Sequence, residues 1–285
     1  MLKTVKQVRA AMSLLNPEEI LNRARRPLDF GLVASSAAAY DQMEEYLLPA
    51  SLPLEERTYL LDKIHRVTDA DTPPSVDLIL FEEGIDRPKG TYTFYRDRPA
   101  DTAAEILRGN PDIELALARQ FPPFRQRVVE GTIHAVATEN AFFALATALP
   151  DIIPSLVELP WAFTEFASDT IFLTGNQVRM AFLIAAAHGK EVGLLNQKGA
   201  ILSIAAGAFG WRALARELVG KIPLGGGLIP KAAIAYAGTY ALGKSLEFYY
   251  RGNRALSRPE RRSLYREALD RGREVAANAV KEAQQ

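Results

Sequence analysis

The sequence predicts an α+β protein that is mainly α: a small α/β domain at residues 28–120, followed by an all-helical bundle at residues 121–285. Three observations indicate this fold class. Short runs of strand-forming residues occur before residue 100. Helical patterns rich in alanine take over from about residue 111. A hydrophobic fraction of 48% is enough to bury a sizeable core.

Residues 1–27 are expected to form N-terminal helices. Leu2, Val5 and Val8 recur at helical spacing with basic residues between them, the pattern of an amphipathic helix that packs on the protein or rests on a membrane surface. These basic residues break the apolar run that a secretory signal needs. A second helix is expected to begin at Pro17 and to end before Pro27.

The α/β domain is predicted from three β-rich apolar runs, at residues 28–33, 76–81 and 91–95. A helical pattern follows the first run, from Tyr40 to Leu47. Strands separated by helical stretches favour a small, mostly parallel sheet, because parallel strands need crossover connections.

The rest of the chain has helical patterns interrupted by proline and glycine. Each interruption is interpreted as the end of one helix and the start of the next. Helices are predicted at 111–119, 124–149, 161–173, 176–189, 191–219, 228–250 and 258–282.

Residues 224–242 are long enough to span a bilayer, but Pro230 and Lys231 lie within them. A lysine in mid-span costs about 2.5–3.5 kcal/mol on insertion scales. Small residues such as Ala233 and Gly243 would permit close contact between helices. A buried hairpin is therefore expected, with a membrane-inserted hairpin over residues 199–243 as the alternative.

Composition excludes several classes of function. The chain has no cysteine, so it has no disulfide, thiolate nucleophile or zinc–thiolate cluster, which fits a reducing, cytoplasmic compartment. Basic and acidic residues balance at 34 each, which gives no net attraction to nucleic acid. The balance is uneven along the chain, because residues 36–120 hold 17 acidic and 9 basic side chains.

Residues 238–245 match the phosphate-loop pattern G-x-x-x-x-G-K-[ST], with Gly238, Gly243, Lys244 and Ser245 at its fixed positions. We interpret the match as false. Such a loop follows a strand and opens a helix, whereas the residues on both sides of this one have helical patterns. Lys244 is accordingly expected on the surface of a helix.

The natural place for a phosphate loop is the turn after the first strand, where the residues are unsuitable. Gly31 is followed by Leu-Val-Ala-Ser-Ser-Ala, without the lysine and second glycine of such a loop. Asp77 and Glu82 flank the second strand, but without that lysine they make a poor magnesium site. The small domain is therefore predicted to be a degenerate nucleotide fold that holds no cofactor.

No catalytic or metal-binding set emerges from the sequence. His65, His134 and His188 lie far apart and lack partners at a convincing metal-ligand spacing. Ser35-Ser36 lacks the G-x-S-x-G elbow of hydrolases. The sequence therefore predicts no catalytic residue, no cofactor and no metal ligand.

The polar residues that stand out lie in the helical region, beside apolar stretches or Pro-Gly turns. Such residues either cap helix ends or mark a docking surface. The candidate interaction residues are Asn176, Gln177, Arg179, Arg212, Arg216 and Lys231.

Five segments of the helical region carry a resemblance to a known family. They are ATENAFFALATALP at 137–150, LTGNQVRM at 173–180, AAAHGK at 185–190, WRALAREL at 211–218 and IPLGGGLIPKAAIAYAGTYALG at 222–243. Through them, residues 125–252 resemble the YcjF-like family, a bacterial group of unknown function whose helical domain accompanies Era-like GTPases. The resemblance implies a GTPase-associated helical domain, membrane association in some members, and no catalytic residues to carry over.

Together these observations predict a non-enzymatic accessory or scaffold protein. Its helical domain would dock onto a GTPase partner or a membrane surface, beside a degenerate GTPase-like domain at residues 28–120. Two alternatives stay open: a nucleotide-binding GTPase-like protein with degenerate motifs, and an integral membrane protein with an inserted helical hairpin.

Overall fold

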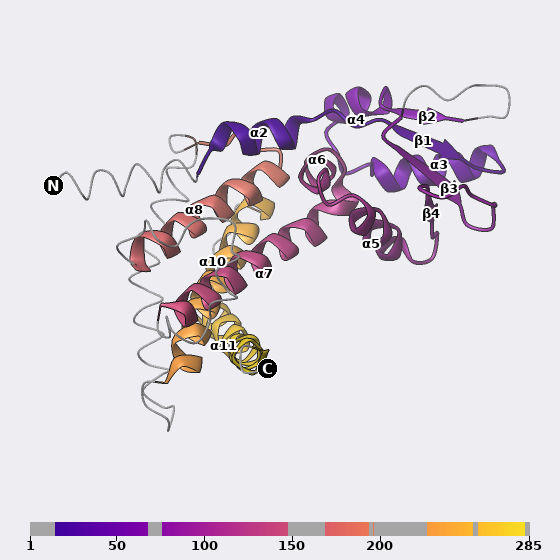
Figure 1. Ribbon diagram of the computed structural model, residues 1–285. Coiled ribbons are helices and arrows are strands. Elements are labelled where there is room, and N and C mark those ends of the chain that lie inside the picture. Colours follow the sequence, from indigo (N-terminus) through magenta and orange to yellow (C-terminus); the bar gives the residue numbers. More distant parts are fainter. Residues whose placement is uncertain are drawn as a thin grey trace. The chain divides into compact units, whose positions relative to one another are not determined.

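A computed structural model describes residues 15–67, 76–147, 169–193, 196, 227–252 and 256–282 (Figure 1). Over these residues the chain is mainly helical, with one small parallel sheet in the N-terminal region. The predicted fold class is therefore confirmed. The N-terminal amphipathic pattern before residue 15, and most of the helix expected at 191–219, lie outside the described residues.

The chain divides into two compact units. Residues 19–129 with 186–190 form the α/β unit. The described residues of 15–18, 130–185 and 191–282 form the helical unit. The division falls inside one long helix, later in the chain than the boundary predicted after residue 120.

The α/β unit combines helices with short strands, and four of its helices, α2 to α5, begin at a proline or after a serine or proline cap. Ser36 caps one helix by accepting a hydrogen bond from the Ala39 backbone N–H at 3.2 Å. The elements are α2 (Pro17–Arg25), β1 (Phe30–Val33), α3 (Ala37–Leu47), α4 (Leu54–Leu61), β2 (Ile64–Arg66), β3 (Leu78–Glu82), β4 (Tyr92–Phe94), α5 (Pro99–Gly109) and α6 (Glu114–Gln120).

The sheet has four parallel strands in the order β2-β1-β3-β4. Phe30 of β1 is in register with Ile64 of β2 on one side and Leu78 of β3 on the other. The chain passes from β1 to β2 in one direction and then crosses to β3 on the far side of β1. Folds of this kind bind ligands at the carboxyl ends of the strands where the direction reverses, here β1 and β3.

The three predicted strands are confirmed, and the sheet has a fourth that the sequence did not indicate. β2 is three residues long, and two of them, His65 and Arg66, are polar. It lies at the edge of the sheet, where one side faces away from the core, so its hydrophobic pattern is weak. Helices α4 and α5 were likewise not predicted.

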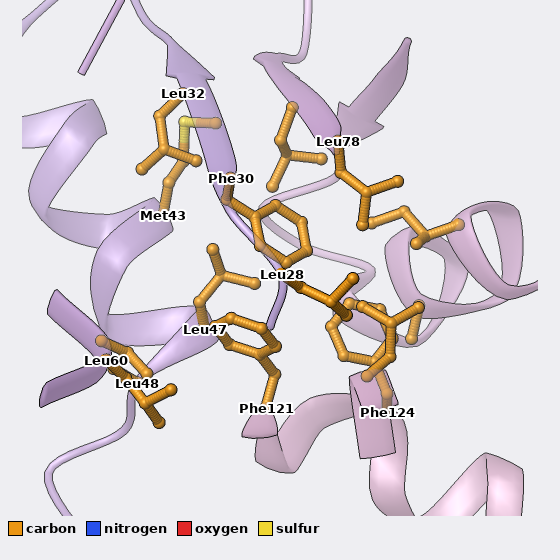
Figure 2. Packing of buried hydrophobic residues seen from close by; sticks show 14 of the residues in the cluster. Leu28, Phe30, Leu32, Met43, Leu47, Leu48, Leu60, Leu78, Phe121 and Phe124 are labelled. Carbon is orange, nitrogen blue, oxygen red and sulfur yellow. The ribbon is translucent and has the colours of Figure 1, made fainter. Parts of the chain in front are cut away.

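The core of the α/β unit is apolar and centred on β1. Phe30 is fully buried, and Figure 2 shows its ring pointing toward Phe121 and Phe124. The ring centroids of Phe30 and Phe121 lie 4.9 Å apart in an edge-to-face arrangement, which is the favoured geometry for an aromatic pair. Leucines of β1, α3 and β3 surround these rings.

The helical unit is built from long helices: α7 (Pro122–Ala146), which begins in the α/β unit, α8 (Asp169–Ala187), α10 (Leu228–Gly252) and α11 (Arg258–Glu282). The predicted helices 124–149, 228–250 and 258–282 are confirmed within the described residues. The break predicted at 174–175 is wrong, because α8 continues through Gly175. A glycine inside a helix costs only about 1 kcal/mol, and the buried side chains of Phe172 and Val178 beside it offset that cost.

Two glycines allow the helices of this unit to approach closely. A Cβ on Gly272 of α11 would lie 2.9 Å from the carbonyl oxygen of Ala233 on α10. A Cβ on Gly243 of α10 would lie 2.8 Å from side-chain carbons of Ile133 on α7 and 3.0 Å from the sulfur of Met180 on α8. The prediction that small residues here permit close helix packing is confirmed at Gly243 and at Ala233, whose backbone Gly272 approaches, whereas nothing lies within 4 Å of a Cβ on Gly238. None of the described helices is long and apolar enough to cross a membrane.

Candidate functional site

The carboxyl edge of the sheet is the place where this topology would hold a ligand. β1 ends at Val33, the chain turns through Ala34 and Ser35, and α3 begins after the cap residue Ser36. In nucleotide-binding folds the backbone N–H groups of this turn and the positive end of the helix dipole receive a phosphate. A phosphate can be bound here only if these N–H groups are not already hydrogen-bonded to another acceptor.

A carboxylate of the chain itself occupies this position. Glu82 is the last residue of β3 and comes directly after Phe81, the partner of Val33 in the β1–β3 register. Its Oε2 atom accepts a hydrogen bond from the Ser35 backbone N–H at 2.7 Å and another from the Ser35 hydroxyl at 2.6 Å. The turn that would cradle a phosphate is bonded to an anion already present.

The environment of Glu82 keeps it charged. The hydrogen bonds from the Ser35 hydroxyl and backbone lower the pKa of this carboxyl, with a smaller contribution from the charge of Arg96, and they outweigh the opposing effect of burial. A carboxyl with a lowered pKa is ionised at neutral pH. A triphosphate entering here would meet a negative charge at short range.

Two arginines that follow β4 bond to other side chains of the chain. Arg98, four residues after the end of β4, forms ion pairs with Glu83 at 3.2 Å and Asp101 at 3.3 Å. Arg96 donates a hydrogen bond to the side-chain oxygen of Gln42 on α3. Asp77, which the sequence places beside Glu82 as a flank of the same strand, lies at the opposite end of β3, where it accepts the Asp29 backbone N–H at 3.0 Å. The two carboxylates do not form a common site.

The segment that matches a phosphate loop lies in the interior of α10. Gly238, Gly243, Lys244 and Ser245 all fall within the continuous helix Leu228–Gly252, so the predicted helical conformation is confirmed. The Ser245 hydroxyl donates to the carbonyl of Ala241 at 2.8 Å, inside the same helix. Because the helix is continuous across these residues, their backbone N–H groups do not form a phosphate-binding loop.

Lys244 is not on the helix surface, which corrects the expectation from the sequence. Its ammonium group bonds to Glu130 of α7 at 2.9 Å and to Glu247 of α10. Burial opposes the positive charge, but these two partners outweigh it and raise the pKa of Lys244. The Tyr240 hydroxyl donates to Glu130 at 2.6 Å, so this lysine belongs to a polar network between two helices.

Three of the predicted interaction residues bond within the helical unit. Asn176 is only 4% exposed and donates to the side-chain oxygen of Asn140 at 3.0 Å. Asn140 in turn donates to the Thr239 hydroxyl at 2.8 Å, and Gln177 donates to the same hydroxyl at 3.3 Å. Arg179 pairs with Glu139 of α7. These side chains connect α7, α8 and α10, and Asn176 does not lie on the surface.

Of the other three candidates, the structure describes only Lys231. Lys231 is exposed near the start of α10, with its ammonium 3.3 Å from the Thr147 hydroxyl. Arg212 and Arg216 lie outside the described residues. Of the four candidates that the structure describes, Lys231 is therefore a surface cation. Asn176, Gln177 and Arg179 bond to neighbouring helices of the unit.

The histidines do not come together. His65 is bonded to Asp29 at 3.1 Å at the amino end of the sheet, and His134 packs edge-to-face on the ring of Tyr236. No group of acidic residues, histidines or cysteines that could hold a metal ion occurs among the described residues.

The α/β unit also contains a cavity of about 560 Å³ that the sequence did not indicate. It lies between α4 with the residues just before it, the corner where α6 meets α7, and residues 188–190. We name it the basic cavity for its charged lining: Glu56, Arg119, Arg125, His188 and Lys190, with Tyr59 beside them. The available sequence signal was the pair of arginines on either side of Pro122-Pro123, a helix break that the sequence did predict.

The comparisons with known proteins add no relative. No family model matches the chain, and neither a curated protein nor a solved structure matches it.

Proposed function

We propose that this chain is a non-enzymatic accessory protein that acts through contact with another protein. In this proposal the α/β unit is a degenerate nucleotide fold that serves as a binding module. The partner class is a GTPase, which follows from the resemblance of residues 125–252 to GTPase-associated helical domains. The proposed location is the cytoplasm, at the inner face of the membrane if the GTPase partner is held there.

The observation that carries the proposal is the bond between Glu82 and Ser35. The carboxylate takes both donors of Ser35 at the carboxyl end of β1, at 2.7 and 2.6 Å. A phosphate would have to displace this anion and would still lack the lysine that neutralises its charge. The desolvation and repulsion of two anions in one turn oppose nucleotide binding.

The polar residues of the helical unit support the same proposal. The cation of the phosphate-loop match, Lys244, is held by Glu130 and Glu247, and Asn176 and Arg179 bond to neighbouring helices. Groups with such partners organise a bundle.

Calorimetry tests the proposal on the full chain. GTP, GDP and ATP should each give no saturable binding heat, with and without Mg²⁺. Saturable binding at micromolar concentration would overturn the proposal and favour a nucleotide-binding protein with degenerate motifs.

A second experiment separates peripheral from inserted membrane contact. After alkaline carbonate extraction of a membrane fraction, the chain should appear in the supernatant. Retention in the membrane pellet would contradict the accessory proposal in favour of the inserted hairpin.

A further inference from the structure

The basic cavity has the size and shape of a recognition site. Its volume of about 560 Å³ lies within the range of roughly 300–1,000 Å³ that is typical of ligand-binding cavities. Leu60, which is 2% exposed, lines the cavity together with the apolar side chains of Leu52 and Pro53. The lining therefore combines an apolar surface with a group of charges, as recognition sites usually do.

Positive charge prevails in the lining. Arg119, Arg125 and Lys190 face one carboxylate of the lining residues, Glu56. Arg125 makes no ion pair with any residue that the structure describes; its guanidinium donates to the backbone carbonyls of Ala187 at 2.8 Å and Ala118 at 3.1 Å.

Backbone carbonyl groups hold both arginines of the cavity in place. Arg119 donates to the carbonyls of Ala186 and Lys190, each at 3.2 Å. Burial lowers the pKa of Arg125. The nearby positive charge of Arg119 also lowers it, whereas the negative charge of Glu56 raises it. A carboxylate that enters this cavity would stabilise the buried cation.

The rim of the cavity carries exposed apolar surface. Tyr59 lines the cavity and is 61% exposed, and Leu54 on the same helix is 80% exposed. With Leu61, these are the large hydrophobic side chains exposed among the described residues of the α/β unit, and all three lie on α4. Exposed apolar groups gathered on one short helix are typical of a protein interaction surface.

The charges of α4 decide the class of ligand. Glu55 and Glu56 occupy its first turn, so a polyanion such as nucleic acid or a polyphosphate would be repelled beside the arginines. A peptide can place one carboxylate among the cations and one apolar side chain on Tyr59. Tyrosine and arginine are also the residues that most often carry binding energy at protein interfaces.

We propose that the basic cavity and the exposed face of α4 bind an acidic peptide segment of the partner protein, which presents a carboxylate next to an aromatic or aliphatic side chain. This inference rests on the proposed contact function and names the surface through which the contact is made. The carboxylate meets Arg125 and Lys190, and the apolar side chain packs on Tyr59.

A display library of short random peptides, selected against the full chain, tests this directly. Enriched peptides should contain Asp or Glu adjacent to an aromatic or aliphatic residue. Their affinity, measured by fluorescence anisotropy, should fall as salt is raised, because the contact is partly ionic. Failure to enrich any peptide, or enrichment without acidic residues, would overturn the proposal.

Two exposed positions locate the contact without endangering the fold. Lys190→Glu and Tyr59→Ser should each weaken binding of an enriched peptide by about tenfold. The matched controls Lys281→Glu on α11 and Tyr249→Ser on α10, which are also exposed, should leave it unchanged. Equal affinity for Lys190→Glu and the unsubstituted chain would overturn the proposal.

The outcomes distinguish this inference from the function on which it rests. If nucleotides give no saturable heat and no acidic peptide binds, only the assignment of the cavity fails. If a nucleotide binds at micromolar concentration, the contact function itself fails.

Discussion

The two units of this chain are stabilised in different ways. The α/β unit has an apolar core around Phe30, and the buried polar side chains described in it are the hydroxyls of Thr91 and Thr102. The helical unit buries amides and a carboxylate between its helices, as in Asn140, Asn176 and Glu247. Burial of apolar area tolerates small shifts in position, whereas paired polar groups require a particular register.

This difference has a consequence for function. The helical unit uses its polar side chains to fix helix against helix, while the α/β unit has more cations than carboxylates in the lining of the basic cavity and exposed apolar groups on α4. Among the described residues, the basic cavity and the three exposed apolar side chains of α4 belong to the α/β unit, and α10 of the helical unit exposes Ile229 and Tyr249. The predictions below test this contrast, from the largest expected effect to the smallest.

Replacing the central ring of the apolar core should have the largest effect. Phe30→Ala removes the contacts with Phe121 and Phe124 and should lower the free energy of unfolding by about 3–5 kcal/mol. Denaturation in urea measures the change. The control Tyr59→Ala removes an exposed ring and should change stability by less than about 0.5 kcal/mol. A loss below about 1 kcal/mol for Phe30→Ala would contradict the apolar-core description.

The closest helix contact should come next. Gly272→Ala places a methyl group 2.9 Å from the Ala233 carbonyl oxygen, so α10 and α11 must separate, at a cost of about 1–3 kcal/mol. Gly238→Ala is the matched control, because nothing lies within 4 Å of a Cβ there. The control should be neutral or more stable by up to about 1 kcal/mol. Equal destabilisation by both changes would disprove the close packing.

A hydroxyl in the helical unit and an ion pair in the α/β unit give a direct contrast. Thr239→Val removes the acceptor for Asn140 and Gln177, which leaves a buried amide without its partner and should cost about 1–3 kcal/mol. Glu83→Gln breaks the exposed pair with Arg98 and should cost less than about 1 kcal/mol. The contrast between the units fails if Glu83→Gln proves the more damaging of the two in the same denaturation assay.

The sequence allowed the long elements to be predicted better than the short ones. The helices α10 and α11 were predicted within two residues because their apolar periodicity runs over 25 residues each. β2 was missed because three residues, two of them polar, carry almost no pattern. Gly175 was taken as a break because local propensity does not include the burial of neighbouring side chains.

The candidate site depended on contacts between distant residues. Glu82 and Ser35 are separated by 47 positions, and only the β1–β3 register brings them together. One of the two partners of Lys244, Glu130, is 114 positions earlier in the chain. The local pattern around Lys244 therefore suggested a surface location, which was wrong. The arginines of the basic cavity are brought to residues 188–190 by chain folding, which no local pattern encodes.

The smallest expected effect concerns pH. The pKa of Glu82 is lowered in the folded chain, so its bonds stabilise the fold above the ordinary pKa of a glutamate, and this contribution disappears as the pH falls through the lowered value. Glu82→Gln should therefore be less stable than the unsubstituted chain at neutral pH, by a small margin because the carboxyl is exposed. Urea denaturation at neutral and acidic pH should show the two curves converging in acid; a gap that widens there would contradict the assignment.

The central claim is that Glu82 closes the turn after β1 to phosphate, and the Ser35 amide resonance reports on it most directly. In NMR spectra of the full chain, this amide should shift as Glu82 titrates, at a pH below the ordinary range for a glutamate, and should not move when GTP is added at neutral pH. A Ser35 amide that shifts saturably with GTP, and is indifferent to the titration of Glu82, would contradict the account.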